Sequence, residues 1–339
     1  MIKVGVVGYG YWGPNMVRNF AEAPGSSVAY VSDLNPKKLE LARKRYPAIR
    51  TTSDYREILA DPEVDAVVIA TPVFAHYEIA MGALQAGKHV LVEKPMTTTS
   101  RQAVELIEAA EKNKRVLTVD HTFVYTGAVR KIQELIASNA LGDIYYYDSV
   151  RINLGLFQHD VNVIMDLAVH DLAIMDYTMK LRPRTVSAIG VSHIPGKPED
   201  VAYLTLFFEV PLIAHIHINW LSPVKIRRTI IGGSSKMVIY DDLEPSEKIK
   251  IYDSGITVSN DDDNRHNLLI GYRTGDMLAP QLKVTEALSI EAQHFCRCIE
   301  QGEKPVVDGA AGLRIVRMLE AANESLAKNG QPVELGLKE

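Results

Sequence analysis

The sequence predicts an α/β protein that begins with a doubly wound parallel sheet and continues into an α+β domain with a large open, mostly antiparallel sheet. Three observations lead to this prediction. The chain has 339 residues, which is long for a single hydrophobic core. Its first third alternates apolar runs with helical patterns, whereas later strands follow one another with few helices. We therefore expect domains at residues 1–122 and 123–339, with the C-terminal helices able to pack back on the first domain.

The elements of the first domain are predicted from their apolar patterns. The expected strands read IKVGVVG, SVAYVSD, AVVIATP, HVLVEKP and VLTVDH, and the helical stretches include PKKLELARKRY, HYEIAMGALQAG and SRQAVELIEAAEKN. Strands that are apolar at nearly every position and are joined by helices are typical of a parallel sheet covered on both faces.

The second domain is predicted to be rich in antiparallel strands. Its expected strands read IYYYDSVRINLG, TVSAIGVSHI, VAYLTLFFEV, LIAHIHINWL and IRRTIIGG. One helix is expected at roughly 160–180, and two more at 286–301 and 309–328 close the chain. The polar stretch DSGITVSNDDDNRHN is expected to be an exposed loop.

The strand VAYLTLFFEV has two unequal faces. One is apolar, and the other carries Tyr203, Thr205, Phe207 and Glu209. Aromatic side chains on the outer face indicate a sheet that is buried against another subunit. The alternative is that these are scattered surface aromatics. We expect a homo-oligomer, a dimer or tetramer, that associates through this open sheet.

Charge and composition exclude several classes of partner. The formal net charge is -5 and the sequence pI is near 6.1, so neither nucleic acid nor an anionic membrane is an expected partner. The N-terminus enters a strand directly, and no apolar run reaches membrane-spanning length, so we expect a cytoplasmic location. Cys296 and Cys298 would point to opposite sides of a helix and are expected to be buried packing residues.

The glycine cluster after the first strand predicts a dinucleotide site. Gly8, Gly10 and Gly13 form a GxGxxG pattern between an apolar strand and a helical stretch, and Pro14 suits the first helical turn. Gly8 would allow a tight turn, Gly10 the close approach of a pyrophosphate, and Gly13 close packing of helix on strand. The helix N-terminus would then present N–H groups to the phosphates.

An acidic residue at the end of the second strand favours NAD over NADP. Asp33 follows Gly10 by twenty-three residues, where a carboxylate accepts hydrogen bonds from the adenosine ribose and repels a 2′-phosphate. Lys37 and Lys38 lie close by in sequence and would soften this preference. A helix-capping role for Asp33 is compatible with the ribose contact.

Polar residues at strand ends are candidates for the chemistry, because ligands bind beyond the carboxyl ends of parallel strands. One such end carries Thr71, Pro72 and His76, and the next carries Glu93 and Lys94. Lys94 comes at the end of an apolar strand, after Glu93, so its ammonium is expected near the nicotinamide. The alternative is an ordinary surface lysine.

A carboxylate and an imidazole lie one helical turn apart in VNVIMDLAVHDLAIMDY. Asp166 and His170 are neighbours on one flank of the expected helix, and the carboxylate would orient the imidazole for proton transfer. A histidine beside an apolar stripe is otherwise a core residue. With Asp171 adjacent, the group also resembles a metal cluster superficially.

Together these motifs identify a family. The GxGxxG at 8–13, Asp33, ATP at 70–72, EKP at 93–95 and the spacing of Asp166 and His170 resemble the Gfo/Idh/MocA oxidoreductases, named after glucose-fructose oxidoreductase, inositol dehydrogenase and rhizopine catabolism. The resemblance covers essentially the whole chain. It implies a Rossmann domain, a second domain with an open sheet, and reversible oxidation of a sugar or cyclitol hydroxyl with NAD(P).

The resemblance also implies roles for individual residues. His170 would take the hydroxyl proton, Lys94 would stabilise charge on the same oxygen, and Asp166 would orient the pair. The amine of Lys94 and the imidazole of His170 are expected to meet at the nicotinamide. The expected cofactor contacts are Gly8, Gly10, Tyr11, Trp12, Gly13, Asp33, Thr71, Pro72, His76, Glu93 and Lys94, and the expected substrate contacts are Lys94, Arg151, Asn153, Asp166 and His170.

Smaller motifs resemble the branch of sugar-nucleotide 3-dehydrogenases that act on UDP-N-acetylglucosamine or its uronate. These motifs are GYWGPN, VRINLG, MDLAVHD and YRTGD. Met165 and Val169 depart from the Trp and Pro common in that branch. Cations for a diphosphate are expected from Arg151, Lys225, Arg227 and Arg228, each of which could instead be a solvated strand-edge charge.

Two alternatives to this function stay open at this point. One is a dehydrogenase of a free sugar or cyclitol, and the other is a non-catalytic NAD-binding regulator. His215, His217 and Asn219 share a strand face, but without a third evident ligand they favour a polar sheet face or a subunit contact. No metal is expected.

Overall fold

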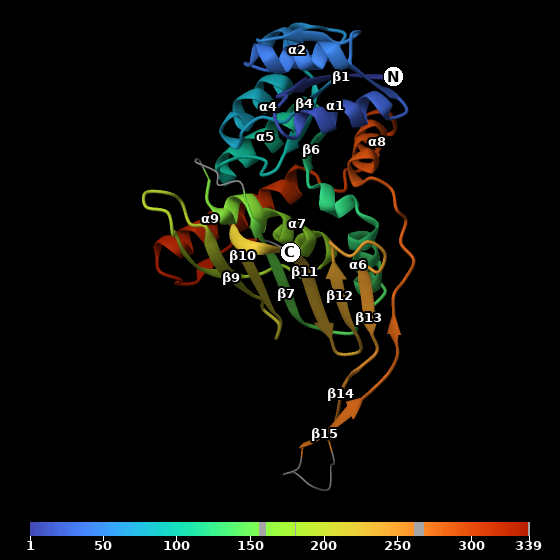
Figure 1. Cartoon of the computed structure of the whole chain (residues 1–339), viewed down its shortest axis with the longest axis vertical. Helices are drawn as coiled ribbons and strands as arrows, with labels where there is room; N and C mark the ends of the chain where they lie inside the picture. Colours follow the sequence, from blue (N-terminus) through green and yellow to red (C-terminus); the bar gives the residue numbers. More distant parts are fainter. Residues whose placement is uncertain (156–160, 180, 261–267, 338–339) are drawn as a thin grey trace. The chain divides into compact units, whose positions relative to one another are not determined.

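The computed structural model describes residues 1–155, 161–179, 181–260 and 268–337 (Figure 1). The chain forms two compact units. The first contains Met1–Thr126 and Thr285–Glu320, and the second contains Gly127–Val284 and Ala321–Glu339. Among the described residues, no helix combines the length and apolar character needed to cross a membrane.

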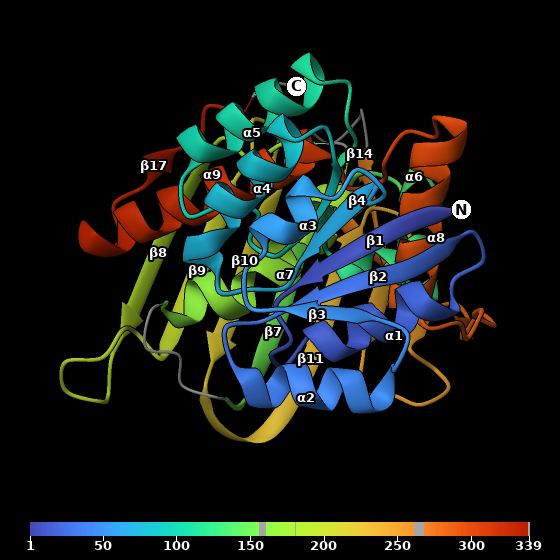
Figure 2. The same cartoon turned by 90° about the horizontal axis from the view of Figure 1, so that it is seen from above.

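The first unit is built on a parallel sheet of six strands in the order β3-β2-β1-β4-β5-β6, which confirms the predicted doubly wound domain. Figure 2 shows β1, β2 and β3 side by side, with α1 and α2 along them. The strands are β1 (Ile2–Val7), β2 (Ser26–Ser32), β3 (Arg50–Thr52), β4 (Ala66–Ile69), β5 (His89–Glu93) and β6 (Leu117–Asp120).

Helices connect these strands and cover them. They are α1 (Gly13–Glu22), α2 (Pro36–Arg45), α3 (Arg56–Ala60), the short η1 (Val73–Ala75), α4 (His76–Gln85), α5 (Ser100–Lys112), η2 (Thr122–Tyr125), α8 (Ala287–Gln301) and the first part of α9 (Gly309–Ala327). Helix α2 begins where its sequence predicts, since Asn35 accepts a hydrogen bond from the Lys37 N–H at 3.0 Å and Pro36 opens the helix.

The two faces of this sheet pack against different helices. Val4 and Val6 of β1 belong to a core cluster with residues of α1, α2 and α8, in which Phe20 and Phe295 meet edge to face at 6.0 Å between centroids. On the opposite face a side chain at Gly5 would overlap Ile58 of α3. The alternation of strand residues therefore buries both faces, as the apolar runs predict.

The second unit is built on a sheet of nine strands in the order β16-β13-β12-β11-β7-β10-β9-β8-β17 (Figure 1). Only the β10–β7 pair is parallel among the described pairs. The strands are β7 (Ile144–Leu154), β8 (Thr185–Val191), β9 (Val201–Phe207), β10 (Ile213–Asn219), β11 (Leu221–Gly233), β12 (Met237–Asp241), β13 (Ile249–Tyr252), β16 (Met277–Leu278) and β17 (Val333–Glu334).

One face of this sheet carries helices, and the other is open. The helical elements of the unit are α6 (Gly127–Ala137), a π-helical turn η3 (Ile164–Ala168), α7 (Val169–Thr178) and the end of α9. On β9, Ala202, Leu204 and Leu206 are fully buried, whereas Tyr203 is 38% and Phe207 is 39% exposed. The predicted division of this strand into a core face and an outer face is confirmed.

Two expectations about this unit need correction. The stretch at 253–267 is not all loop, because Gly255–Asn260 forms β14, which pairs with β15 (Leu268–Arg273) in a two-stranded antiparallel sheet; residues 261–267 lie outside the described residues. The helix expected at 160–180 is shorter and begins with the turn η3, and positions 160 and 180 are likewise not described.

Candidate active site

The first turn of the Rossmann unit accepts only glycine at two positions. Gly8 has a φ of +98°, and a Cβ there would overlap the carbonyl oxygen of Ala70, the residue after β4. A Cβ on Gly13 would overlap the carbonyl oxygen of Gly8. Gly8 therefore allows the tight turn, and Gly13 allows the helix to pack closely against it.

Gly10 differs from its neighbours because the space beside it is open. The nearest heavy atom to a Cβ at Gly10 would be Lys38 Nζ, at 3.7 Å. The adjacent helix α1 has no side-chain cap, since the side chain of Trp12 at its N-cap makes no hydrogen bond to the first turn. An open backbone beside an uncapped helix N-terminus suits the pyrophosphate of a dinucleotide.

Asp33 braces this turn from the end of β2. Its Oδ2 accepts a hydrogen bond from the Tyr9 N–H at 2.7 Å, and its Oδ1 accepts one from the Asn35 N–H at 2.8 Å. Lys38 Nζ lies 3.6 Å from Oδ2. Asp33 thus orders the glycine turn as well as standing at the position predicted for a ribose contact, while the cap of α2 is Asn35.

The two aromatic residues of the turn lie in different environments. Tyr11 is 86% exposed. Trp12 is partly buried, and its indole N–H donates to Asp120 Oδ2 at 2.6 Å. Asp120 ends β6, so the indole ties the beginning of α1 to the far edge of the same sheet.

His76 joins the turns that follow β4 and β5. It is almost fully buried, with Nε2 at 2.8 Å from the Thr71 carbonyl oxygen and Nδ1 at 2.9 Å from that of Pro95. Burial lowers the pKa of His76, whereas its hydrogen bonds to the two carbonyl oxygens act to raise this pKa. These contacts join the turn that holds Thr71 to the turn that holds Pro95, and the cofactor contact expected of His76 stays a prediction.

Other buried polar atoms at this edge have no hydrogen-bond partner in the part of the chain that the structure describes. Thr71 Oγ1 is buried and makes no hydrogen bond within the described residues, and the same is true of both ring nitrogens of His121. Burial, followed by the nearby charge of Lys94, lowers the pKa of His121 to about 3. The sequence analysis missed Asp120 and His121, although two polar residues ending the strand VLTVDH were a signal for them.

In the second unit, Asp166 and His170 lie on adjoining helical turns. Asp166 is on the π-helical turn η3, and His170 is in the first turn of α7. Asp166 Oδ2 accepts a hydrogen bond from the indole N–H of Trp220 at 3.1 Å, and Trp220 is fully buried. π-helical turns are frequent at functional sites. In this one, the Asp166 carboxylate is held by the buried Trp220 side chain.

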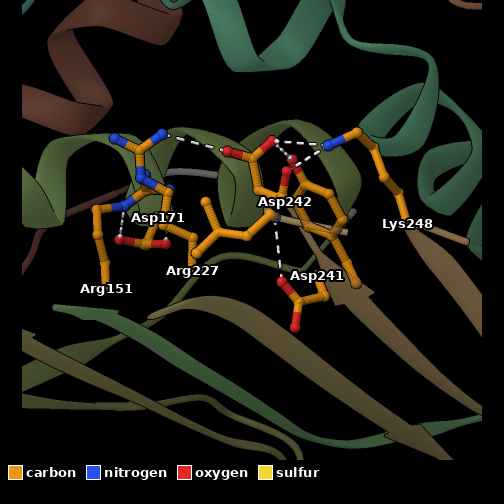
Figure 3. A network of polar contacts seen from close by, with 8 residues as sticks. Arg151, Asp171, Arg227, Asp241, Asp242 and Lys248 are labelled. Carbon is orange, nitrogen blue, oxygen red and sulfur yellow. Dashed lines mark hydrogen bonds and ion pairs between the residues drawn. The ribbon is translucent and has the colours of Figure 1, made fainter. Parts of the chain in front are cut away.

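Three of the four cations predicted to hold a diphosphate are engaged with carboxylates. Figure 3 shows two of these pairs, Arg151 with Asp171 and Arg227 with Asp242. Arg151 is buried, with Nε at 2.7 Å from Asp171 Oδ2 and Nη2 at 3.1 Å from Oδ1. Arg227 Nη1 lies 3.2 Å from Asp242 Oδ2, and Arg228 Nη2 lies 2.9 Å from Asp241 Oδ2. Lys225 is exposed on β11.

This arrangement changes the interpretation of Arg151. Asp171 also accepts a hydrogen bond from Ser149 Oγ at 2.7 Å, so its carboxylate fastens α7 to two residues of β7. A buried, bidentate pair of this kind supports the fold around His170, and the substrate contact expected of Arg151 stays a prediction. Asn153, on the same strand face, is partly buried.

The histidines of β10 form an aromatic ladder on the open sheet face. The Tyr203 ring stacks on His217 at 4.4 Å and lies 6.0 Å from His215 between centroids. His215 Nδ1 is 3.2 Å from Thr205 Oγ1, and Asn219 Oδ1 accepts a hydrogen bond from its neighbour Leu221. Within the described part of the chain, no three His, Cys, Asp or Glu residues are grouped to hold a metal ion.

The glycine turn gives a matched pair of variants. Gly8→Ala forces a side chain onto the Ala70 carbonyl at a positive φ, so we expect the free energy of unfolding to fall by roughly 1–3 kcal/mol or more. Gly10→Ala meets no such obstacle and should fold normally but bind NAD more weakly. Urea denaturation and NAD titration measure the two effects. Equal stability losses in both variants would contradict this assignment.

Comparison with known proteins agrees with this architecture. Residues 2–121 match the profile described as the oxidoreductase family with an NAD-binding Rossmann fold, and residues 129–239 match the GFO/IDH/MocA C-terminal domain. The first unit is therefore an NAD-binding domain.

Relatives of this chain include sugar dehydrogenases. UDP-N-acetylglucosamine 3-dehydrogenase of Acidithiobacillus ferrooxidans is 28% identical over 324 residues, which cover 93% of this chain and 94% of that protein. Its solved structure has a TM-score of 0.82 at 25% identity and covers 97% of this chain and 99% of that chain. scyllo-Inositol 2-dehydrogenase (NAD⁺) of Bacillus subtilis is 23% identical over 350 residues, covering 99% of this chain and 97% of that protein.

A further solved structure is that of an oxidoreductase from Agrobacterium radiobacter in complex with NAD⁺, L-tartaric acid and magnesium. It has a TM-score of 0.82 at 19% identity and covers 99% of this chain and 98% of that chain, which shows the shared fold. The two matching domain profiles cover most of the sequence. The chain belongs to the Gfo/Idh/MocA family of NAD-binding oxidoreductases.

Proposed function

We propose that this dehydrogenase oxidises a secondary hydroxyl, at C3, of a nucleotide-linked sugar. The observation that carries the proposal is the shared edge of one parallel sheet, where the glycine turn follows β1 and Lys94 directly follows β5. This shared edge supports a role for the Lys94 ammonium group at the nicotinamide end of the dinucleotide. The sugar-nucleotide class is supported by the 28% identity to UDP-N-acetylglucosamine 3-dehydrogenase over nearly the whole chain.

The proposed chemistry divides between proton and hydride. Bound NAD supplies the hydride acceptor. His170 takes the hydroxyl proton, and Lys94 donates a hydrogen bond to the same oxygen as negative charge develops. Asp166, which accepts a hydrogen bond from the Trp220 indole, orients the imidazole. The proton, the hydride and the charge on the oxygen are thereby all accounted for.

A free sugar or cyclitol is the second candidate substrate. The observation that favours it is the engagement of Arg151, Arg227 and Arg228 with carboxylates, because a diphosphate would have to compete for each of those cations. The relationship to scyllo-inositol 2-dehydrogenase points the same way. Both candidates use the same proton and hydride steps and differ only in what surrounds the reacting ring.

NAD is the preferred cofactor in this proposal, with NADP less favoured. The Asp33 carboxylate would repel a 2′-phosphate, while Lys38 beside it lessens that repulsion. Asp33 also holds the Tyr9 N–H, so its removal disturbs the turn for both cofactors. The preference must therefore be judged from the ratio of the two affinities.

We further propose that the open sheet face joins copies of this chain into a dimer or tetramer. Support comes from the apolar side chains that this face exposes, among them Ile189, Tyr203, Phe207 and Ile213. A solution mass of two or four chains agrees with this proposal, and a mass of one chain opposes it.

The first prediction concerns the proton acceptor. His170→Ala should lower turnover by roughly two orders of magnitude or more while the Kd for NAD stays nearly unchanged, because the imidazole acts on the substrate hydroxyl and not on cofactor binding. Steady-state rates with UDP-N-acetylglucosamine and with myo-inositol, together with NAD titration, provide the measurement. Wild-type turnover in the variant would remove His170 from the mechanism.

The second prediction concerns cofactor choice. Asp33→Ala should weaken NAD more than NADP, because only NAD loses a ribose contact while NADP is relieved of repulsion. Calorimetric titration with each cofactor measures the ratio of the dissociation constants. Asp54→Ala, an exposed aspartate beyond β3, is the control and should leave the ratio unchanged. An unchanged ratio in Asp33→Ala as well would contradict the ribose contact.

A further inference from the structure

A second acidic side chain reaches the edge of the Rossmann sheet where Asp120 holds Trp12. Asp120 ends β6 and stands opposite Glu93 of β5 in the parallel register. Glu291 comes from α8, which packs against α1 and η2 in the same unit. Asp120 is 1% exposed and Glu291 is 2% exposed, so the two acids are both removed from water.

Asp120 has the donors that an ionised carboxylate needs. Its Oδ2 accepts from the Trp12 indole at 2.6 Å, and its Oδ1 accepts from Thr122 Oγ1 at 2.5 Å. Charge-assisted hydrogen bonds of this length are strong. Asp120 therefore carries the negative charge and connects the residue before α1 to the turn η2.

Glu291, unlike Asp120, lies in surroundings that disfavour an ionised carboxylate. Neither of its carboxyl oxygens meets a hydrogen-bond donor among the described residues. The charged groups that face it are the carboxylates of Asp120 and Glu93, and on its own helix His294 lies one turn further along with its ring against Tyr125. Burial first, and then Asp120 and Glu93, raise the pKa of Glu291 well above its usual range.

The hydrogen bonds around Asp120 and Glu291 favour one protonation state of this pair of carboxyl groups. Two facing carboxyl groups cannot both ionise away from water, so the pair retains a proton. Because Asp120 is held by two donors, the proton belongs on Glu291. A protonated Glu291 can then donate its O–H to Asp120 and satisfy both groups.

We propose that Glu291 acts as a positioning residue in its protonated form, donating to Asp120 so that Asp120 and Trp12 hold the start of α1 in place for NAD. The proposal goes beyond the reaction proposed above and rests only on NAD binding by this unit. Loss of the proton would leave two buried negative charges side by side. NAD affinity should therefore decline, together with stability, as the pH rises through the folded pKa of Glu291.

The sign of the pH dependence follows from the raised pKa. Glutamate in the unfolded chain titrates near about 4.3, and in the folded chain Glu291 titrates at a higher pH. Its contribution to stability is therefore fully present below the unfolded pKa and is lost as the pH rises through the folded pKa. His121 does not account for this effect, because its pKa is lowered to about 3.

The test compares two substitutions of Glu291. Glu291→Gln keeps the shape and a neutral N–H donor but cannot titrate, so its Kd for NAD at neutral pH should stay within about threefold of wild type. Its affinity should no longer decline as the pH rises. Glu291→Ala removes the donor and leaves a cavity, and should weaken NAD binding by about tenfold at neutral pH. Calorimetric NAD titration of the full chain across the pH range measures all of these.

Controls separate this proposal from its alternatives. Glu300→Gln alters an exposed residue of the same helix and should behave as wild type at every pH. Circular dichroism and thermal unfolding confirm that each variant is folded. A decline with rising pH that persists unchanged in folded Glu291→Gln, or a wild type without any decline, overturns the role of Glu291. Neither result decides whether the first unit binds NAD, which the titration at neutral pH measures. Neither result decides whether the protein oxidises a sugar.

Discussion

The contact of Gly8 with the backbone of Ala70, the residue after β4, is the constraint on which the site depends. A turn this close to Ala70 fixes where α1 begins, and Gly13 packs that beginning against Gly8 itself. The surrounding polar groups then hold the turn from two sides, Asp33 through the Tyr9 N–H and Asp120 through the Trp12 indole. The result is a helix N-terminus without a side-chain cap, in a fixed position, which is the kind of site that suits the phosphates of a dinucleotide.

The second unit uses buried charge in a comparable way. Asp171 fastens α7 to β7 through Arg151 and Ser149, and Asp166 is fixed by the Trp220 indole one turn earlier. Buried polar groups of this kind are costly unless each finds a partner, and a change in either partner would move His170. The helix that carries the proposed base is thus held by side chains that never touch substrate.

Local patterns in the sequence predict much of this molecule. Apolar runs predict the parallel strands because both sheet faces are buried, and the GxGxxG pattern predicts positions where a Cβ has no room. Pairings over long sequence distances are not visible in such patterns. Arg151 looks like a free cation until Asp171 packs against it, and nothing local connects Glu291 with Asp120. The strand β14 is not predicted from the sequence, because the alternation of Ile256 and Val258 with polar residues is short and lies within a stretch rich in Gly, Ser, Asn and Asp.

The central claim is that a hydride leaves a sugar carbon for the NAD held by the first unit. Its most direct test incubates the wild-type protein with NAD and UDP-N-acetylglucosamine deuterated at C3, with deuterated myo-inositol in parallel, and examines the reduced dinucleotide by mass spectrometry. The account predicts that deuterium from one of these substrates appears in the dinucleotide while that substrate becomes a ketone. Protein that binds NAD but forms no labelled dinucleotide from either substrate would contradict it.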